Sequence, residues 1–368
     1  MKLVCKKSII LNGLQIVSKA VPVRTTFPIL ECILIDASKG EIKLIANDTD
    51  LGIETVIEGD IVEPGILALE AKIFVEMIRK LPENDITIVS DGNYNTVITC
   101  EKTKFNLLGK SGDDFSYLPK IEKKNNIVIS QFTLKEVIRQ TIFSIADNDN
   151  KIMMGELFEV TDDHLKIVSL DGHRISLRNI ALKNSYDHIK VIVPGKALNE
   201  ISKILTGEAD KDVTIFFTDR HIMFEFDSTI VLSRLIEGEY FQIDNMLSKD
   251  YESKIHISKK ELYDCIDRAS LMVKEGDKKP IILDVKDRNL ELMINSVVGS
   301  MNENIDIQKT GTDMKIGFNP KFLMDALKVI DDDEIDMYLI NPKSPCIIRD
   351  NDGSYVYLIL PVNFTVSN

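Results

Sequence analysis

The feature that most constrains the fold is a pattern that occurs three times along the 368-residue chain. Each copy holds two short apolar segments on either side of a polar turn, which is typical of a β-hairpin. The predicted hairpins pair residues 33–35 with 41–48, 157–160 with 164–169, and 281–285 with 289–294. Their turns contain residues 38–40, 162–163 and 287–288.

A second pattern also recurs in each copy: a strand that leads into a short helix with apolar residues three and four positions apart. These helices are predicted over residues 73–81, 197–205 and 322–330, and a strand follows each at 85–88, 212–215 and 334–337. A further helix opens each copy, over residues 8–20, 133–145 and 258–272. Ser130 or Thr133 is the expected N-cap of the second of these, and Ser258 that of the third.

Polar linkers at residues 121–126 and 247–253 separate the copies. We therefore predict an α+β protein of three repeated domains, over residues 1–122, 128–247 and 254–368. Each domain has two helices and antiparallel sheets made of many short strands.

The composition, 44% hydrophobic and 28% charged, is that of a soluble globular protein. No apolar stretch approaches the roughly 20 residues of a membrane span, and the basic N-terminus lacks the apolar core of a secretory signal. The five cysteines are scattered and odd in number, which indicates unpaired thiols in a cytoplasmic protein. No metal or other cofactor is expected.

The net charge of −13 argues against a protein that binds nucleic acid through its overall charge. The repeated helix nevertheless carries a basic residue at both ends, seven positions apart and so on one face. These residues are Lys72 and Arg79, Lys196 and Lys203, and Lys321 and Lys328. A solvated face with cations near the helix C-terminus would explain one such helix, but three matching copies favour a shared polyanion.

A ring of six such domains could accept duplex DNA. Twelve helices spaced about 10 Å apart would leave an opening of roughly 28 Å. Phosphates about a Debye length from the lining would be attracted weakly and without regard to sequence, which permits sliding.

Five motifs carry a family resemblance: residues 26–30 (TFPIL), 169–175 (SLDGHRI), 191–196 (VIVPGK), 236–240 (IEGEY) and 358–362 (LILPV). In this order, and over essentially the whole chain, the sequence resembles the β subunit of bacterial DNA polymerase III, the DNA sliding clamp. The resemblance implies a non-enzymatic processivity factor for DNA replication: a head-to-tail homodimer whose ring encircles duplex DNA. The implied partners are the DNA polymerase III catalytic subunit, the clamp loader, and other DNA polymerases and repair proteins.

The resemblance also implies three sets of site residues. The DNA-channel candidates are Arg24 and five of the six basic residues above, namely Lys72, Arg79, Lys196, Lys203 and Lys328. The implied dimer interface comprises Phe105, Leu107, Leu271 and Met272, for which ordinary core packing is the alternative. The implied pocket for partner peptides comprises Met154, Leu170, Gly172, His173, Arg174, Ile175, Met246, Asn319, Phe322, Leu358, Leu360, Pro361 and Val362.

The chain departs from the family pattern at three positions near this pocket. Asn363 and Asn245 stand where Arg is usual or common, and Phe241 stands where Pro is common. We expect the pocket still to bind a peptide with a Gln and an apolar or aromatic end, because its apolar walls remain.

Two other classes of function remain open. An enzyme could use His173 beside Asp171 and Arg174, but Asp-Gly is a common turn and no partner nucleophile stands in a recognisable motif. Acidic runs at 48–50, 147–149 and 331–334 are interpreted as solvated loops, not metal sites, and no ATP-binding P-loop is present. The remaining alternative is a peptide-binding scaffold of repeated domains that never encircles DNA.

Overall fold

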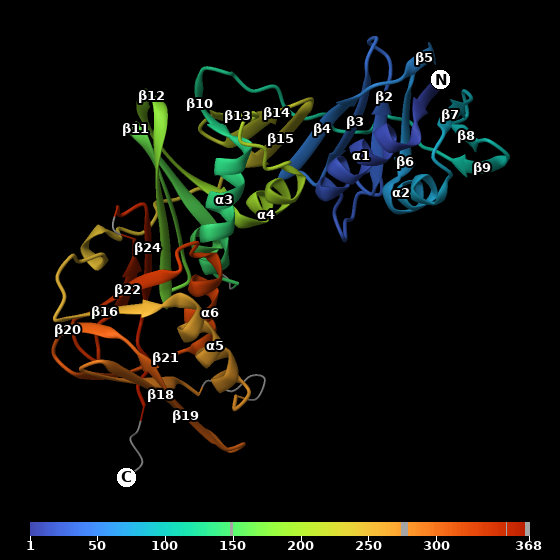
Figure 1. Ribbon diagram of the computed structural model, residues 1–368. Helices are drawn as coiled ribbons and strands as arrows, with labels where there is room; N and C mark the ends of the chain where they lie inside the picture. The colour runs from blue at the N-terminus through green and yellow to red at the C-terminus, as the bar shows by residue number, and fades with distance from the viewer. Residues whose placement is uncertain (148–149, 274–278, 351, 365–368) are drawn as a thin grey trace. The chain divides into compact units, whose positions relative to one another are not determined.

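The computed structural model describes residues 1–147, 150–273, 279–350 and 352–364. The chain packs as two compact units, Met1–Lys135 with Lys196–Leu235 and Glu136–Gly195 with Ile236–Asn368 (Figure 1). These units cut across the three repeats, because strands of neighbouring repeats pair into common sheets. All strand pairs between the named strands are antiparallel.

The first unit contains a five-stranded and an eight-stranded sheet. The first sheet runs, in spatial order, β5 (Asp60–Glu63), β1 (Lys2–Lys6), β7 (Asp85–Ser90), β8 (Asn95–Cys100) and β9 (Thr103–Leu108). The second runs β10 (Asn125–Ser130), β13 (Asp212–Phe217), β14 (His221–Phe226), β15 (Thr229–Arg234), β4 (Leu51–Ile57), β3 (Ile42–Asn47), β2 (Cys32–Asp36) and β6 (Ile66–Glu70). Within it β4 of the first repeat pairs with β15 of the second.

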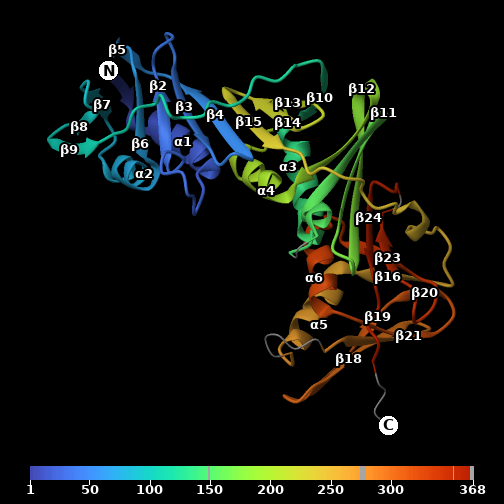
Figure 2. The ribbon, with the colours of Figure 1, turned by 180° about the vertical axis from the view of Figure 1, so that it is seen from behind.

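Helices α1 (Lys7–Val17) and α2 (Ala71–Lys80) lie side by side in this unit, and the single turn η1 (Ser18–Ala20) extends α1 (Figures 1 and 2). The buried side chains of α1 recur every three or four residues, at Ile10, Leu14 and Val17, as an amphipathic helix requires. Leu118, three residues before the first linker, packs against apolar clusters of both the first and the second repeat, and a Cβ atom at Gly52, on β4, would overlap it. Gly52 therefore permits this segment to lie close to the sheet.

The second unit contains a seven-stranded and a four-stranded sheet. The first runs β11 (Gly155–Leu170), β12 (Arg174–Pro194), β24 (Tyr355–Ile359), β23 (Cys346–Arg349), β22 (Glu334–Leu339), β16 (Ser253–Ser258) and β20 (Gln308–Gly311). The second runs β19 (Ser300–Asp306), β18 (Asn289–Asn295), β17 (Ile281–Lys286) and β21 (Met314–Phe318). Here β12 of the second repeat pairs with β24 of the third.

Helices α5 (Lys259–Ser270) and α6 (Pro320–Val329) lie side by side in the second unit (Figures 1 and 2). They contribute Leu262, Ile266 and Leu323 to an apolar core shared with both sheets. Helices α3 (Gln131–Thr141) and α4 (Gly195–Ile204) belong to the second repeat, and both cross the division between the units. Single turns η2 (Ile142–Ser144), η3 (Lys151–Met154) and η4 (Asp244–Met246) complete the structure.

The predicted α+β fold with repeated pairs of helices is confirmed. The second helix of each repeat begins two residues earlier than predicted, directly or almost directly after the preceding strand. Ser130 rather than Thr133 caps α3, because its hydroxyl accepts the Thr133 backbone N–H at 3.1 Å. Ser258 caps α5 as expected.

The first and third predicted hairpins are confirmed as β2–β3 and β17–β18. In the second repeat both predicted strands form one element, β11, and each half pairs with β12. The predicted pairing of residues 157–160 with 164–169 is therefore wrong. At the predicted turn the register with β12 shifts, and Asp162 has a φ of +52°. No helix in the described part of the chain combines the length and apolarity that a bilayer span requires.

Candidate functional site

The basic residues at the ends of the second helices are exposed in all three repeats. Lys72 and Arg79 lie on α2, Lys196 and Lys203 on α4, and Lys321 and Lys328 on α6. Arg24 is exposed in the loop between η1 and β2. The structure thus places every DNA-channel candidate where a polyanion could reach it.

Neighbouring carboxylates engage several of these cations. Arg79 pairs with Glu76, and Lys203 pairs with Glu200 at 2.7 Å. Lys196 pairs with Asp48, in the turn before β4. Arg79 and Lys203 line one cavity of about 830 Å³, together with Lys19. Sequence reasoning missed Lys19, which ends the α1 segment outside the repeated helix.

The Asp171-Gly172-His173-Arg174 segment forms a tight turn between β11 and β12. Gly172 has φ +86°, a conformation that glycine adopts without strain. The Asp171 carboxylate accepts the backbone N–H groups of His173 at 2.9 Å and Arg174 at 3.1 Å. Asp171 therefore holds the turn, which leaves it poorly placed to act as a partner in acid–base chemistry.

Arg174 is buried, with 7% of its side chain exposed, and its guanidinium is held on three sides. It donates to Asp171 at 2.8 Å, to Asp325 at 2.6 Å and to the Phe143 carbonyl at 2.5 Å. Its Cζ atom lies 4.5 Å from the centre of the Phe322 ring. Burial alone would lower the pKa of Arg174, but Tyr357, Asp325 and Asp171 outweigh burial and raise it. The guanidinium is therefore always positively charged.

Four other predicted pocket residues are linked to Arg174 through Phe322 and His173. The His173 and Phe322 rings are nearly parallel, with centres 6.0 Å apart. The His173 carbonyl accepts the Leu360 backbone N–H at 2.8 Å. Asn319 caps α6 by accepting the Lys321 N–H at 3.0 Å, which sets the start of the helix that carries Phe322.

The apolar pocket candidates divide into buried and exposed groups. Leu170, Ile175 and Leu358 are buried in one cluster with Tyr240 and Ile243. Met154, Met246 and Leu360 are 42%, 55% and 39% exposed. Pro361 and Val362 are half-buried, and the Val362 N–H donates to the Gly317 carbonyl at 2.8 Å. The structure thus has a buried apolar cluster, and Met154, Met246 and Leu360 each lie within two residues of a side chain that belongs to it or packs against it.

The positions that depart from the family pattern are exposed. Phe241 is 39% exposed and lies edge-on to Tyr240, with ring centres 6.0 Å apart. Asn245 and Asn363 are exposed polar side chains. These replacements therefore lie on the surface, outside the buried cluster.

Two of the four predicted interface residues lie on an edge strand. Phe105 and Leu107 are half-buried on β9, the edge strand of the five-stranded sheet. Leu271 is 75% exposed and Met272 packs partly against the core, both directly after α5. Exposure of Leu271 disfavours core packing as its role.

Sequence reasoning missed Asp325, Phe143 and Tyr357. Tyr357 donates its hydroxyl to the Phe322 carbonyl at 2.7 Å, and with Asp325 and Phe143 it supports the predicted site. Asp325 had a sequence signal: it occupies the helix position at which the other repeats carry Glu76 and Glu200. Phe143 and Tyr357 had no such signal.

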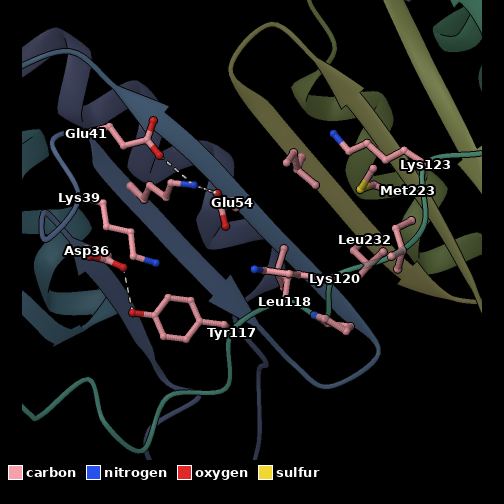
Figure 3. A pocket seen from close by; sticks show the side chains of 14 residues that line it. Asp36, Lys39, Glu41, Glu54, Tyr117, Leu118, Lys120, Lys123, Met223 and Leu232 are labelled. Atoms are coloured by element: carbon pink, nitrogen blue, oxygen red, sulfur yellow. Dashed lines mark hydrogen bonds and ion pairs between the residues drawn. The ribbon is translucent and has the colours of Figure 1, made fainter.

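The sequence also did not predict a cavity of about 510 Å³ beside the first linker (Figure 3). Tyr117 donates to Asp36 at 2.9 Å, and Lys43 lies between Glu41 at 3.0 Å and Glu54 at 2.6 Å. Burial raises the pKa of Asp36, but hydrogen bonds from Ser38 and Tyr117 outweigh it and lower the pKa. These carboxylates are therefore engaged in structural pairs.

Within residues 1–147, 150–273, 279–350 and 352–364, no three His, Cys, Asp or Glu side chains are arranged to hold a metal ion. The acidic run at 147–149 lies outside this description from residue 148 onwards. The five cysteines are buried and unpaired.

Comparisons with known proteins cover the chain from end to end. The N-terminal, central and C-terminal domains of the DNA polymerase III beta subunit match residues 1–119, 128–242 and 244–363. The beta sliding clamps of Staphylococcus epidermidis and Staphylococcus aureus are 33% and 34% identical to it over 98% of this chain and 99% of theirs.

Solved structures agree with these relatives. A putative DNA polymerase III beta subunit from Eubacterium rectale is 65% identical, with a TM-score of 0.97 over 99% of this chain and 100% of that one. The DNA polymerase sliding clamp from Bacillus subtilis is 34% identical, with a TM-score of 0.96 over the same shares. The chain therefore belongs to the DNA polymerase III beta subunit family, the DNA sliding clamps.

Proposed function

We propose that this sliding clamp works as a homodimeric ring that encircles duplex DNA in the cytoplasm and holds partner proteins there. Its partners are the DNA polymerase III catalytic subunit, the clamp loader, and other DNA polymerases and repair proteins. The clamp itself contributes topology and binding, without a catalytic centre of its own. Its domains are those of the three repeats, over residues 1–122, 128–247 and 254–368.

The observation that carries the DNA-binding part is the repeated placement of exposed cations. The same helix presents a basic residue near both ends in every repeat, although the chain has a net charge of −13. Such cations attract phosphates without reading bases. Weak attraction combined with a closed ring permits sliding while preventing escape.

The site around Arg174 supports the partner-binding part. Exposed Met154, Met246 and Leu360 provide apolar contacts for a Leu or Phe anchor. The Arg174 guanidinium and the exposed His173 supply polar groups that orient a peptide. A short peptide with a Gln and an apolar or aromatic end suits this combination.

Sheet edges support the dimer. An edge strand exposes a row of unpaired backbone groups, and β9 and β19 are such edges in separate sheets. We propose that β9 of one chain pairs with β19 of its partner, where Phe105 and Leu107 meet Leu271 and Met272. Two such head-to-tail contacts close a ring.

The test is retention on DNA after loading by a purified clamp loader. Wild type should stay on nicked circular DNA and slide off once that DNA is linearised. Replacing Lys72, Lys196 and Lys321 together by Glu should impair both loading and retention, because it reverses charge on all three helices.

A matched control replaces three exposed lysines elsewhere, Lys39, Lys183 and Lys343, by Glu, which changes the net charge by the same amount. This control should load and slide as wild type does. Equal retention of wild type on circular and linear DNA would instead favour a scaffold that does not encircle DNA.

A further inference from the structure

The second helix of each repeat carries an acidic residue between its two cations. Glu76, Glu200 and Asp325 occupy equivalent positions, each four residues after the first cation and three before the second. Residues three apart on a helix are neighbours on its surface, so the acid can pair with the second cation.

In the first two repeats the acid does so. Glu76 pairs with Arg79 and Glu200 pairs with Lys203, within α2 and α4. In the third repeat Asp325 turns away from Lys328 and binds the Arg174 guanidinium at 2.6 Å. Lys328 instead lies over the Tyr263 ring, with its Nζ atom 6.0 Å from the ring centre.

The cause is the environment of Arg174. The Arg174 side chain is 7% exposed and its guanidinium requires acceptors on several sides, whereas Lys328 is exposed and solvated. A carboxylate gains more from a buried guanidinium than from an exposed ammonium, because water screens the second pair. Asp171 and the Phe143 carbonyl satisfy the other two sides, and Asp325 completes the set.

We propose that Asp325 is a shared carboxylate that couples the partner site to the DNA-facing surface of α6. This inference rests on the proposed function, in which Arg174 faces a partner peptide and Lys328 faces DNA. While Arg174 holds Asp325, the charge of Lys328 remains available to phosphate. A partner that turns Arg174 away from Asp325 releases the carboxylate to Lys328, and the third helix then attracts DNA less.

The experiment is a cycle of variants measured by the affinity for a short fluorescent duplex at low salt. Arg174→Met removes the guanidinium while leaving an apolar side chain of similar length. It should weaken duplex binding about twofold, the scale of an exposed pair three positions apart on a helix. Asp325→Asn alone should leave the affinity unchanged, because Lys328 is already free of it.

The combined Arg174→Met, Asp325→Asn variant should bind the duplex as wild type does, because no carboxylate remains to neutralise Lys328. In a Lys328→Gln background, Arg174→Met should have no effect on duplex affinity. A crystal structure of Arg174→Met should show Asp325 against Lys328. A simple loss of folding at Arg174 would produce neither the rescue nor the dependence on Lys328.

The outcomes separate this inference from the proposed function. If wild type binds the duplex and the combined variant binds as weakly as Arg174→Met, the proposal that Asp325 is a shared carboxylate is wrong and the proposed clamp function stands. The shared carboxylate is also wrong if Arg174→Met binds the duplex as tightly as wild type. If wild type does not bind the duplex at any salt concentration, the DNA-facing role itself fails.

Discussion

Two buried ionisable residues of the second repeat are accommodated in opposite ways. Arg174 is surrounded by acceptors, and its pKa is raised. Glu156, on β11, is fully buried, and neither of its carboxylate oxygens has a hydrogen-bond partner among the residues that the structure describes. A buried charge without partners is costly, so such a group binds a proton instead. Burial raises the pKa of Glu156 to about 8, although the nearby Thr141 side chain opposes this rise.

A pH dependence follows from Glu156. The folded chain keeps its proton at pH values at which the unfolded chain has lost it, so the free energy of unfolding falls as pH rises towards about 8. The slope is roughly 1.4 kcal/mol per pH unit. Glu156→Gln removes this dependence, so its free energy of unfolding relative to wild type should be about 3 kcal/mol higher at pH 9 than at pH 6. Urea denaturation of both proteins at pH 6 and pH 9 measures these free energies of unfolding.

The matched control is Glu159→Gln, three residues along the same strand. Burial would raise the pKa of Glu159, but Lys166, at 2.7 Å, and Lys190 outweigh burial and lower it. Its stabilising contribution is present above the ordinary pKa and is lost only as pH falls. The difference in the free energy of unfolding between Glu159→Gln and wild type should therefore be the same at pH 6 and pH 9. If the difference in the free energy of unfolding between Glu156→Gln and wild type is also the same at pH 6 and pH 9, Glu156 is charged in the folded chain.

At the scale of elements, α6 joins both proposed surfaces. Its N-cap, Asn319, precedes the turn that carries Phe322, and its last turn carries Lys328. Asn319 was predicted as a pocket residue, but its side chain accepts the Lys321 N–H. The structure therefore shows that Asn319 positions the helix, and its contact with a peptide stays a prediction.

The capping role of Asn319 predicts different effects for two substitutions at this position. Asn319→Ala should lower the free energy of unfolding by about 1 kcal/mol and weaken binding of a fluorescent clamp-binding peptide, because the first turn of α6 frays. Asn319→Ser retains a capping oxygen and should preserve both. Loss of peptide binding in Asn319→Ser, with stability retained, would mean that the Asn319 amide contacts the peptide directly.

At the scale of the whole molecule, neighbouring repeats are joined by continuous sheets. Pairing of β4 with β15 and of β12 with β24 places halves of the second repeat in different packing units. The same logic extends to the free edges β9 and β19, which we propose pair between chains.

The dimer can be tested with one exposed residue. Leu271 is 75% exposed in the single chain, so Leu271→Glu should cost the folded monomer little. If Leu271 lies in the interface, the buried carboxylate should shift the protein from dimer to monomer in sedimentation velocity runs. Val62→Glu, a 54% exposed position on β5, is the control and should remain dimeric. An unchanged dimer in Leu271→Glu would remove that residue from the interface.

Much of the fold was predictable from the sequence because its signals are local. Apolar spacing, polar turns and capping residues predicted the helices α1 to α6. They also predicted the hairpins of the first and third repeats, but not the pairing in the second. The exposed cations of α2, α4 and α6 followed from the same spacing, since a helix places residues seven apart on one face. For the candidate site, family motifs supplied the residues and the internal repeat supplied only the basic positions.

The sequence by itself thus determined the repeat, its helices and the positions of its cations, since each depends on residues close together in the chain. Only the tertiary structure decided which side chains those cations and acids meet. Arg174 and Asp325 are 151 positions apart, and Glu156 loses its solvent only when the strands and helices around it pack. Burial and long-range pairing depend on the packed whole, so the same acid position pairs along its helix in two repeats and with another repeat in the third.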